Sequence, residues 1–184
     1  MHMPATRAVQ AYGQSIWYDN LERGLLHSGR LAHMIHEQGL RGLTSNPTIF
    51  EKAILGSYDY DDALAAARRQ YPRATAQDLF YLLAIDDIRA AADLFAPLFR
   101  DSGGRDGLVS LEVSPDLAYD SEATVAEAVA LYERVGRPNL MIKVPATEPG
   151  LHAIEALTDQ GLSVNVTLLF SVARYEAVVD AYLL

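Results

Sequence analysis

The most constraining feature of the sequence is a fivefold alternation of short apolar segments with longer helical patterns. The apolar segments are rich in branched or aromatic residues and have the length of β-strands. They lie at Ser15–Asp19, Gly42–Thr44, Leu108–Val113, Leu140–Val144 and Leu162–Leu168. The helical patterns lie at Leu21–Gln38, Pro47–Leu55, Tyr58–Gln70, Thr75–Leu98, Ser121–Val135, Gly150–Asp159 and Val172–Leu184. A strand followed by a helix, repeated in this way, predicts parallel βα units with right-handed crossovers.

The chain length suits one folded body built from these units. At 184 residues it can bury one substantial core, and no stretch of linker composition interrupts it. We therefore predict a single α/β domain over residues 1–184, with a disordered N-terminus over residues 1–10.

Alternate residues within four of the strands separate polar from apolar side chains, and alternate residues of a strand face opposite sides of its sheet. One side carries Ile16, Tyr18, Val109, Leu111, Val113, Leu140, Ile142, Val144, Val164, Val166 and Leu168. The other carries Ser15, Trp17, Asp19, Ser110, Glu112, Ser114, Met141, Lys143, Ser163, Asn165 and Thr167. A doubly wound sheet is apolar on both faces, whereas a βα-barrel has one apolar, helix-facing side and one lumen side. The pattern predicts a (β/α)8 TIM barrel, of which this chain carries about five βα units.

The polar side chains fall toward the carboxyl ends of their strands, where barrel active sites form. The candidate site residues are Asp19, Thr44, Asn46, Glu112, Lys143, Asn165 and Thr167. A buried lysine that loses its proton becomes a nucleophile toward carbonyl groups. Asp19 and Glu112 would then supply acid–base chemistry, and the amides and hydroxyls would hold substrate hydroxyls. The alternative is that Lys143 and Glu112 form a structural ion pair.

Composition excludes several other functions. A net charge of −9 has the wrong sign for gripping nucleic acid or anionic lipid over a broad surface, so an anionic substrate must meet a local cluster of positive charge. The absence of cysteine removes disulfides and thiolate chemistry, and no apolar run has the length of a membrane span. We expect a cytoplasmic protein. His33 and His36 lack the H-E-x-x-H spacing of a zinc site, so we predict no metal.

Five stretches of the chain resemble transaldolase, in order and with suitable spacing. They are SIWYDNLERGLL (Ser15–Leu26), GLTSNPTIFEKAI (Gly42–Ile54), SLEVSPDLAYD (Ser110–Asp120), NLMIKVPATEPGLHAI (Asn139–Ile154) and SVNVTLLFSVARY (Ser163–Tyr175). The combination of TSNP, IKVPAT and NVTLLFS is highly specific, and the stretches together span nearly the whole chain.

The resemblance implies transfer of a dihydroxyacetone unit between ketose and aldose phosphates through a lysine Schiff base, without metal or cofactor. It places the imine on Lys143, the acid–base carboxylates on Asp19 and Glu112, and substrate-holding groups on Thr44, Asn46, Asn165 and Thr167. Glu112 would act through a water. The implied substrates are fructose 6-phosphate, sedoheptulose 7-phosphate, erythrose 4-phosphate and glyceraldehyde 3-phosphate of the pentose phosphate pathway. A homo-oligomer is a further expectation, and neither nucleic acid nor membrane is an expected partner.

Length is the departure from this family, since a complete barrel has eight strands and about 250 residues. The arginine that binds the substrate phosphate and a serine of the family's active site have no counterpart here. Three hypotheses remain open at this point: a transaldolase or an aldolase that releases the three-carbon unit, a catalytically incomplete barrel fragment or assembly piece, and a five-stranded receiver-like or nucleotide-binding module. For the chain alone we expect exposed strand edges, self-association and negligible turnover.

Overall fold

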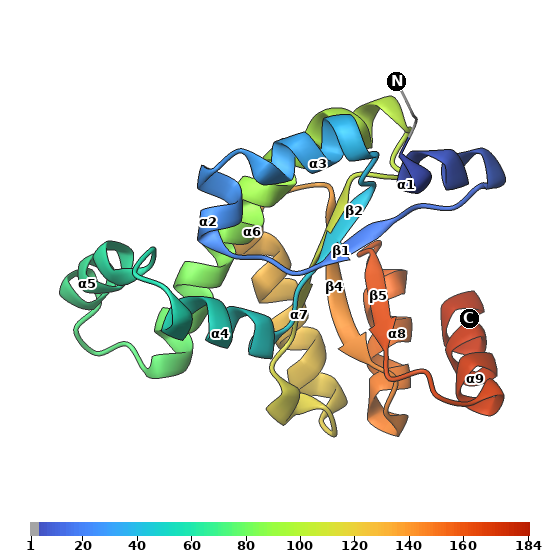
Figure 1. Ribbon diagram of the computed structural model, residues 1–184. Coiled ribbons are helices and arrows are strands. Elements are labelled where there is room, and N and C mark those ends of the chain that lie inside the picture. The colour runs from blue at the N-terminus through green and yellow to red at the C-terminus, as the bar shows by residue number, and fades with distance from the viewer. Residues whose placement is uncertain (1–3) are drawn as a thin grey trace. The chain divides into compact units, whose positions relative to one another are not determined.

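The computed structural model describes residues 4–184 and has an α/β architecture of parallel strands alternating with helices (Figure 1). Its contacts divide the chain into two compact units, Met1–Val109 (unit 1) and Ser110–Leu184 (unit 2). The single domain therefore stays a prediction, and each unit is described in turn. Among residues 4–184, no helix combines the length and apolar character needed to cross a membrane.

Unit 1 contains two of the predicted strands in full. Its elements are α1 (Ala5–Ala8), the 3₁₀ helix η1 (Val9–Tyr12), β1 (Trp17–Asp19), α2 (Arg23–His27), α3 (Arg30–Gln38), β2 (Gly42–Thr44), α4 (Pro47–Gly56), α5 (Asp61–Gln70), α6 (Ala76–Asp101) and the start of β3 (Leu108–Glu112). Strands β1 and β2 pair in parallel, with Asp19 opposite Thr44 and Trp17 opposite Gly42. The long helix α6 buries an apolar face that includes Leu83, Ile88 and Phe95.

Local chemistry explains where the helices of unit 1 begin and end. Asn46 caps α4, with Pro47 in its first turn, and Thr75 and Asp78 form a capping box at the start of α6. The single helix predicted over Leu21–Gln38 is two helices in the structure. Gly29 takes a left-handed φ of 75° between them, a conformation that interrupts a right-handed helix.

The N-terminal segment differs from the expectation of disorder over residues 1–10. Residues 1–3 lie outside the described residues, but α1 and η1 are helical. The side chains of Thr6 and Arg7 donate to the carbonyls of Gln38 and His36, and Gln10 Nε2 donates to Gly39 O at 2.7 Å. These bonds hold the segment against the end of α3, and sequence patterning does not reveal such contacts.

Unit 2 contains the rest of the predicted βα units. Its elements are the end of β3, the 3₁₀ helix η2 (Pro115–Leu117), α7 (Ser121–Val135), β4 (Leu140–Pro145), α8 (Glu148–Asp159), β5 (Val164–Thr167) and α9 (Val172–Leu183). The N-caps of α7, α8 and α9 are Asp120, Thr147 and Ser171, whose side chains each accept a backbone N–H of the first turn. Strand order in this unit is β3-β4-β5, and α7 and α8 pack against β4 (Figure 1).

The apolar side predicted for the central strands is confirmed. Leu111, Val113, Leu140, Ile142 and Val144 are each at most 2% exposed. Helices α7 and α8 contribute buried residues such as Leu131 and Leu157 to the same core. The apolar residues are thus committed to packing, which leaves the opposite face of the strands to the polar side chains.

Candidate functional site

A buried lysine beside a carboxylate is the central feature of unit 2. Lys143 lies on β4 and Glu112 ends β3, with Lys143 Nζ 3.3 Å from Glu112 Oε2. The two side chains are 10% and 21% exposed, respectively. Val113 N donates to Lys143 O at 3.2 Å, so strand pairing sets the two residues side by side. Strand pairing therefore places the two side chains together, and both are largely shielded from solvent.

Asn165 and Thr167 of β5 extend this polar face. The register places Asn165 opposite Lys143 and Thr167 opposite Pro145, and Asn165 Nδ2 donates to Ser110 Oγ at 3.0 Å. Ser110, Glu112, Lys143 and Asn165 therefore share one face, as their strand parity predicts. Thr167 Oγ1 is buried without a hydrogen-bond partner among the described residues. Such a hydroxyl is ready to bond a ligand that reaches it.

The remaining predicted site residues belong to unit 1. Asp19 is exposed at the end of β1 and lies opposite Thr44 at the end of β2. Thr44 Oγ1 is also buried without a hydrogen-bond partner among the described residues. Asn46 also caps α4, because its Oδ1 accepts from Ile49 N at 2.9 Å, and its contact with substrate stays a prediction. The convergence of all seven residues in one lumen stays a prediction.

The Trp17 ring occupies the space that a side chain at position 42 would take. A Cβ added to Gly42 would lie 2.3 Å from the Trp17 ring. The indole therefore packs directly on the backbone of β2, which accounts for the glycine. This contact supports a packing role for Trp17 on the face it shares with Asp19.

A second charged cluster lies in unit 1 and has no counterpart in the sequence-based candidates. Arg23 and Asp87 form a buried ion pair with a 2.9 Å N–O distance, and Tyr60 donates its hydroxyl to Asp87 at 2.8 Å. The Arg23 guanidinium lies 4.5 Å from the centroid of the Tyr60 ring. Burial is the main cause that raises the pKa of both Asp87 and Tyr60. Because 64 residues separate Arg23 from Asp87, no local motif could have paired them.

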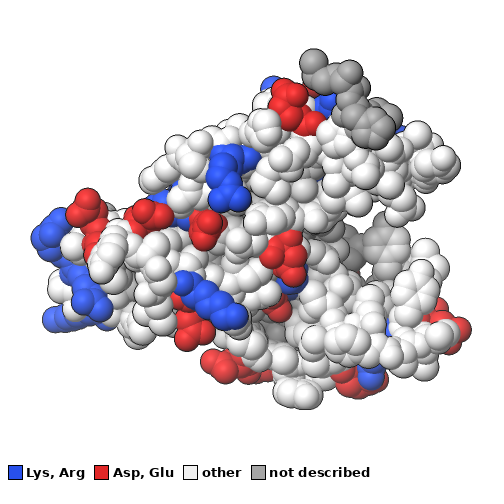
Figure 2. All heavy atoms as spheres, viewed as in Figure 1, with Lys and Arg blue, Asp and Glu red and all other residues white. Residues whose placement is uncertain are grey.

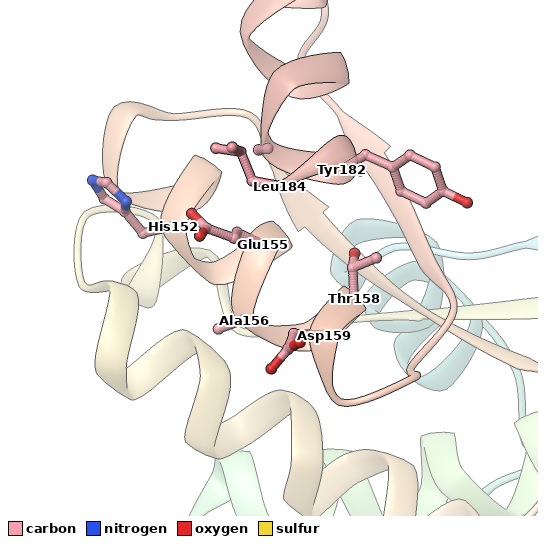
Figure 3. A pocket seen from close by; sticks show the side chains of 8 residues that line it. His152, Glu155, Ala156, Thr158, Asp159, Tyr182 and Leu184 are labelled. Carbon is pink, nitrogen blue, oxygen red and sulfur yellow. The ribbon is translucent and has the colours of Figure 1, made fainter.

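A pocket of about 370 Å³ in unit 2 is distinct from the Lys143 pair. It is lined by residues of α8 and by the end of the chain, including Tyr182 and Leu184 (Figure 3). His152, Glu155 and Asp159 give it a polar wall, and its lining includes neither Lys143 nor Glu112. Within residues 4–184, no three His, Cys, Asp or Glu side chains are grouped so as to hold a metal ion.

The surface charges agree with an acidic composition. Figure 2 shows basic and acidic side chains interspersed on the face in view. An anionic ligand would therefore need a local positive group rather than a general field.

Comparisons with known proteins bear on the whole chain. A family model described as Transaldolase/Fructose-6-phosphate aldolase matches residues 16–182. A protein of Thiobacillus denitrificans named Transaldolase is 53% identical over 180 residues, which cover 98% of this chain and 50% of that relative. Transaldolase 2 of Nostoc punctiforme is 47% identical over 95% of this chain and 45% of its own length. Transaldolase of Mycobacterium tuberculosis is 46% identical over 98% of this chain and 48% of its own length. The chain thus spans about half the length of the curated relatives it matches.

Proposed function

Because the chain belongs to the transaldolase/fructose-6-phosphate aldolase family, a family of TIM barrels, we propose that it carries the imine-forming centre of a transaldolase. The proposed reaction moves a dihydroxyacetone unit from a ketose phosphate to an aldose phosphate. Lys143 is the proposed nucleophile, and no metal or cofactor takes part.

The observation that carries this proposal is the Lys143–Glu112 pair. A 3.3 Å separation allows direct proton exchange or exchange through one bridging water, and the lysine side chain is only 10% exposed. Imine formation requires an unprotonated amine to attack the ketone carbon and then requires loss of water from the carbinolamine. A carboxylate beside the amine can accept the first proton and return one to the departing hydroxyl. A structural ion pair would need none of this chemistry, which makes amine reactivity the deciding test.

The two carboxylates are assigned different steps. Glu112 manages protons and water at the imine, because it lies against Lys143. Asp19 removes the substrate hydroxyl proton, so that the adjacent carbon–carbon bond breaks, the aldose leaves, and the electron pair passes into the imine as an enamine. Attack of that enamine on a second aldehyde, followed by hydrolysis, frees Lys143.

Substrate hydroxyls are assigned to polar groups at the strand ends. The buried hydroxyls of Thr44 and Thr167 have no partner among the described residues, so a bound hydroxyl would satisfy them. Asn165 retains its carbonyl oxygen as an acceptor while its amide group donates to Ser110. Asn46 offers its amide N–H groups, since its oxygen caps α4.

The finer assignments follow from the family. They are fructose 6-phosphate and sedoheptulose 7-phosphate as donors, erythrose 4-phosphate and glyceraldehyde 3-phosphate as acceptors, a place in the pentose phosphate pathway, a cytoplasmic location and a homo-oligomeric state. The alternative is a barrel piece that forms the imine without completing turnover. The chain spans about half the length of the relatives it matches, so imine formation and turnover are measured separately.

The experiment exploits the presence of only two lysines, Lys52 and Lys143. The chain is incubated with dihydroxyacetone and borohydride, digested, and each lysine peptide is analysed by mass spectrometry. We expect a reduced three-carbon adduct on Lys143 and little on Lys52, which is exposed on α4 and serves as an internal standard for ordinary amine reactivity.

Matched variants complete the test. Lys143→Arg should lose the adduct, because a guanidinium stays protonated and forms no imine, whereas Lys52→Arg should leave it unchanged. Equal modification of both lysines, or of neither, would show that Lys143 is a structural cation. An adduct from dihydroxyacetone without turnover of fructose 6-phosphate would favour the barrel-piece alternative.

A further inference from the structure

We propose that Thr147 is a positioning residue that holds Lys143 against Glu112 by tying the loop after β4 to the loop after β3. The inference rests on the proposed function for its chemical consequence and on the contacts within unit 2 for its geometry. The two hydrogen bonds of the Thr147 hydroxyl join backbone groups of the two loops, so its effect on the pair would be transmitted through the backbone.

The hydroxyl of Thr147 makes two hydrogen bonds of opposite kind. It accepts from Gly150 N at 3.0 Å, as the cap of α8, and it donates to the carbonyl of Ala118. Ala118 directly follows η2, six residues after Glu112, and Thr147 follows Lys143 by four residues. One hydroxyl therefore connects the segments that leave the two strands of the reactive pair.

The loop after β4 has little freedom to move. Ala146 N donates to Thr167 O at 2.8 Å, which attaches the residue before Thr147 to the end of β5. A Cβ added to Gly150 would lie 2.0 Å from Pro145 O, so the first turn of α8 is packed on the end of β4. With these neighbours in place, the Thr147 hydroxyl sets the distance to the loop after β3.

The loop after β3 is braced by α7 at two further points. Ser114 N donates to a carboxylate oxygen of Glu127 at 2.5 Å, and Thr124 Oγ1 donates to Leu117 O at 2.8 Å. Helix α7 and Thr147 thus hold this loop from two sides. Catalytic groups lose effectiveness when supporting contacts let them drift by about 1 Å, and a 3.3 Å pair is sensitive to such drift.

The two roles of Thr147 can be separated by substitution. Aspartate is a good N-cap and can still accept from Gly150 N, but its ionised carboxylate has no proton to donate to Ala118 O and repels that carbonyl. Thr147→Asp therefore keeps the start of α8 and breaks the connection between the loops. Thr147→Ser retains both hydrogen bonds and should behave as the wild type.

The experiment measures two reactions of Lys143 that should change in opposite directions. With dihydroxyacetone and borohydride, adduct formation at Lys143 relative to Lys52 should fall by about 10-fold or more in Thr147→Asp, because the proton-exchanging carboxylate is displaced. With acetic anhydride alone, acetylation of Lys143 relative to Lys52 should rise several-fold, since the amine is no longer held against Glu112. Thr147→Ser should leave both ratios at their wild-type values.

Matched controls separate this role from general stability. Thr158→Val removes the hydroxyl that bonds Ile154 O at the other end of α8 and should leave both ratios unchanged. Thermal unfolding of each variant identifies loss of the fold, and if Thr147→Asp does not fold, the near-isosteric Thr147→Val, which loses the α8 cap as well as the bond to Ala118 O, is measured instead. Wild-type acetylation ratios in the folded Thr147 variant would overturn the proposal. If the wild type gives no selective adduct, the proposed function fails, and the acetylation ratio still decides the role of Thr147.

Discussion

Asp87→Ala should destabilise unit 1 strongly, because it removes the partner of a buried cation. Arg23 and Asp87 are 10% and 4% exposed in their side chains, and their ion pair has a 2.9 Å N–O distance. Without Asp87, the guanidinium keeps a 3.5 Å contact to Leu83 O and the face of the Tyr60 ring. Neither contact carries a negative charge, so a positive charge remains buried without a counterion.

The expected loss in free energy of unfolding is about 3–5 kcal/mol, the usual cost of removing one member of a buried ion pair. The Tyr60 hydroxyl also loses its acceptor, since it donates to Asp87 at 2.8 Å. This second effect pushes the value toward the upper end of the range.

Urea unfolding followed by Trp17 fluorescence is a suitable assay. Trp17 is the only tryptophan of the chain and lies in unit 1, packed on Gly42. Asp86→Ala is the matched control, because Asp86 is 64% exposed and pairs with Arg89 at 3.5 Å. A surface pair of this kind contributes about 0.2–0.5 kcal/mol. Free energies within about 1 kcal/mol for Asp87→Ala and Asp86→Ala would refute the reasoning, since surface substitutions usually change stability by no more than about 0.5 kcal/mol.

Three further predictions concern the alkaline stability of unit 1, its strand packing and the division of labour between the carboxylates. The pKa of Tyr60 is raised, so above pH ~10 the unfolded chain releases a proton that the folded chain retains, and stability falls as pH rises. Tyr60→Phe should remove that part of the slope in urea unfolding above pH ~10, and an unchanged slope would contradict the assignment. Gly42→Ala places a Cβ 2.3 Å from the Trp17 ring, so it should lower the free energy of unfolding by about 1–3 kcal/mol and shift the Trp17 emission maximum. Wild-type emission and stability would show that β2 tolerates a side chain there. Glu112→Ala should slow borohydride-trapped imine formation from dihydroxyacetone, while Asp19→Ala should leave it measurable and, in a preparation that cleaves fructose 6-phosphate, block that cleavage. Failure of both variants at the same step would refute the division.

The order of elements could be predicted because it follows from local patterns. The prediction of β2 at Gly42–Thr44 and of α7 at Ser121–Val135 matches the structure in both bounds. The prediction over Leu21–Gln38 missed a break at Gly29, because an amphipathic pattern continues across a two-residue interruption and does not report φ. Helix α1 was also missed, since it is held by contacts with the end of α3.

The candidate site was partly predictable for the same reason. Strand parity groups Lys143 with Glu112 and Asn165, because alternation along a strand is a local property. The sequence does not distinguish a helix-capping role of Asn46 from a substrate-binding role, since both roles use the same side-chain amide. It also passed over Thr147, whose partner Ala118 is 29 residues away in the sequence.

The sequence by itself determined the alternation of strands and helices, the faces on which the residues of the central strands lie, and the family to which the chain belongs. These depend on the spacing of apolar residues and on short motifs, which act over a few neighbouring positions. The tertiary structure alone decided that Lys143 Nζ lies 3.3 Å from Glu112 Oε2, that Arg23 meets Asp87 across 64 residues, and that one threonine hydroxyl joins two loops. Such contacts form only when distant segments pack, because their geometry is set by the shape of the core and by no local preference.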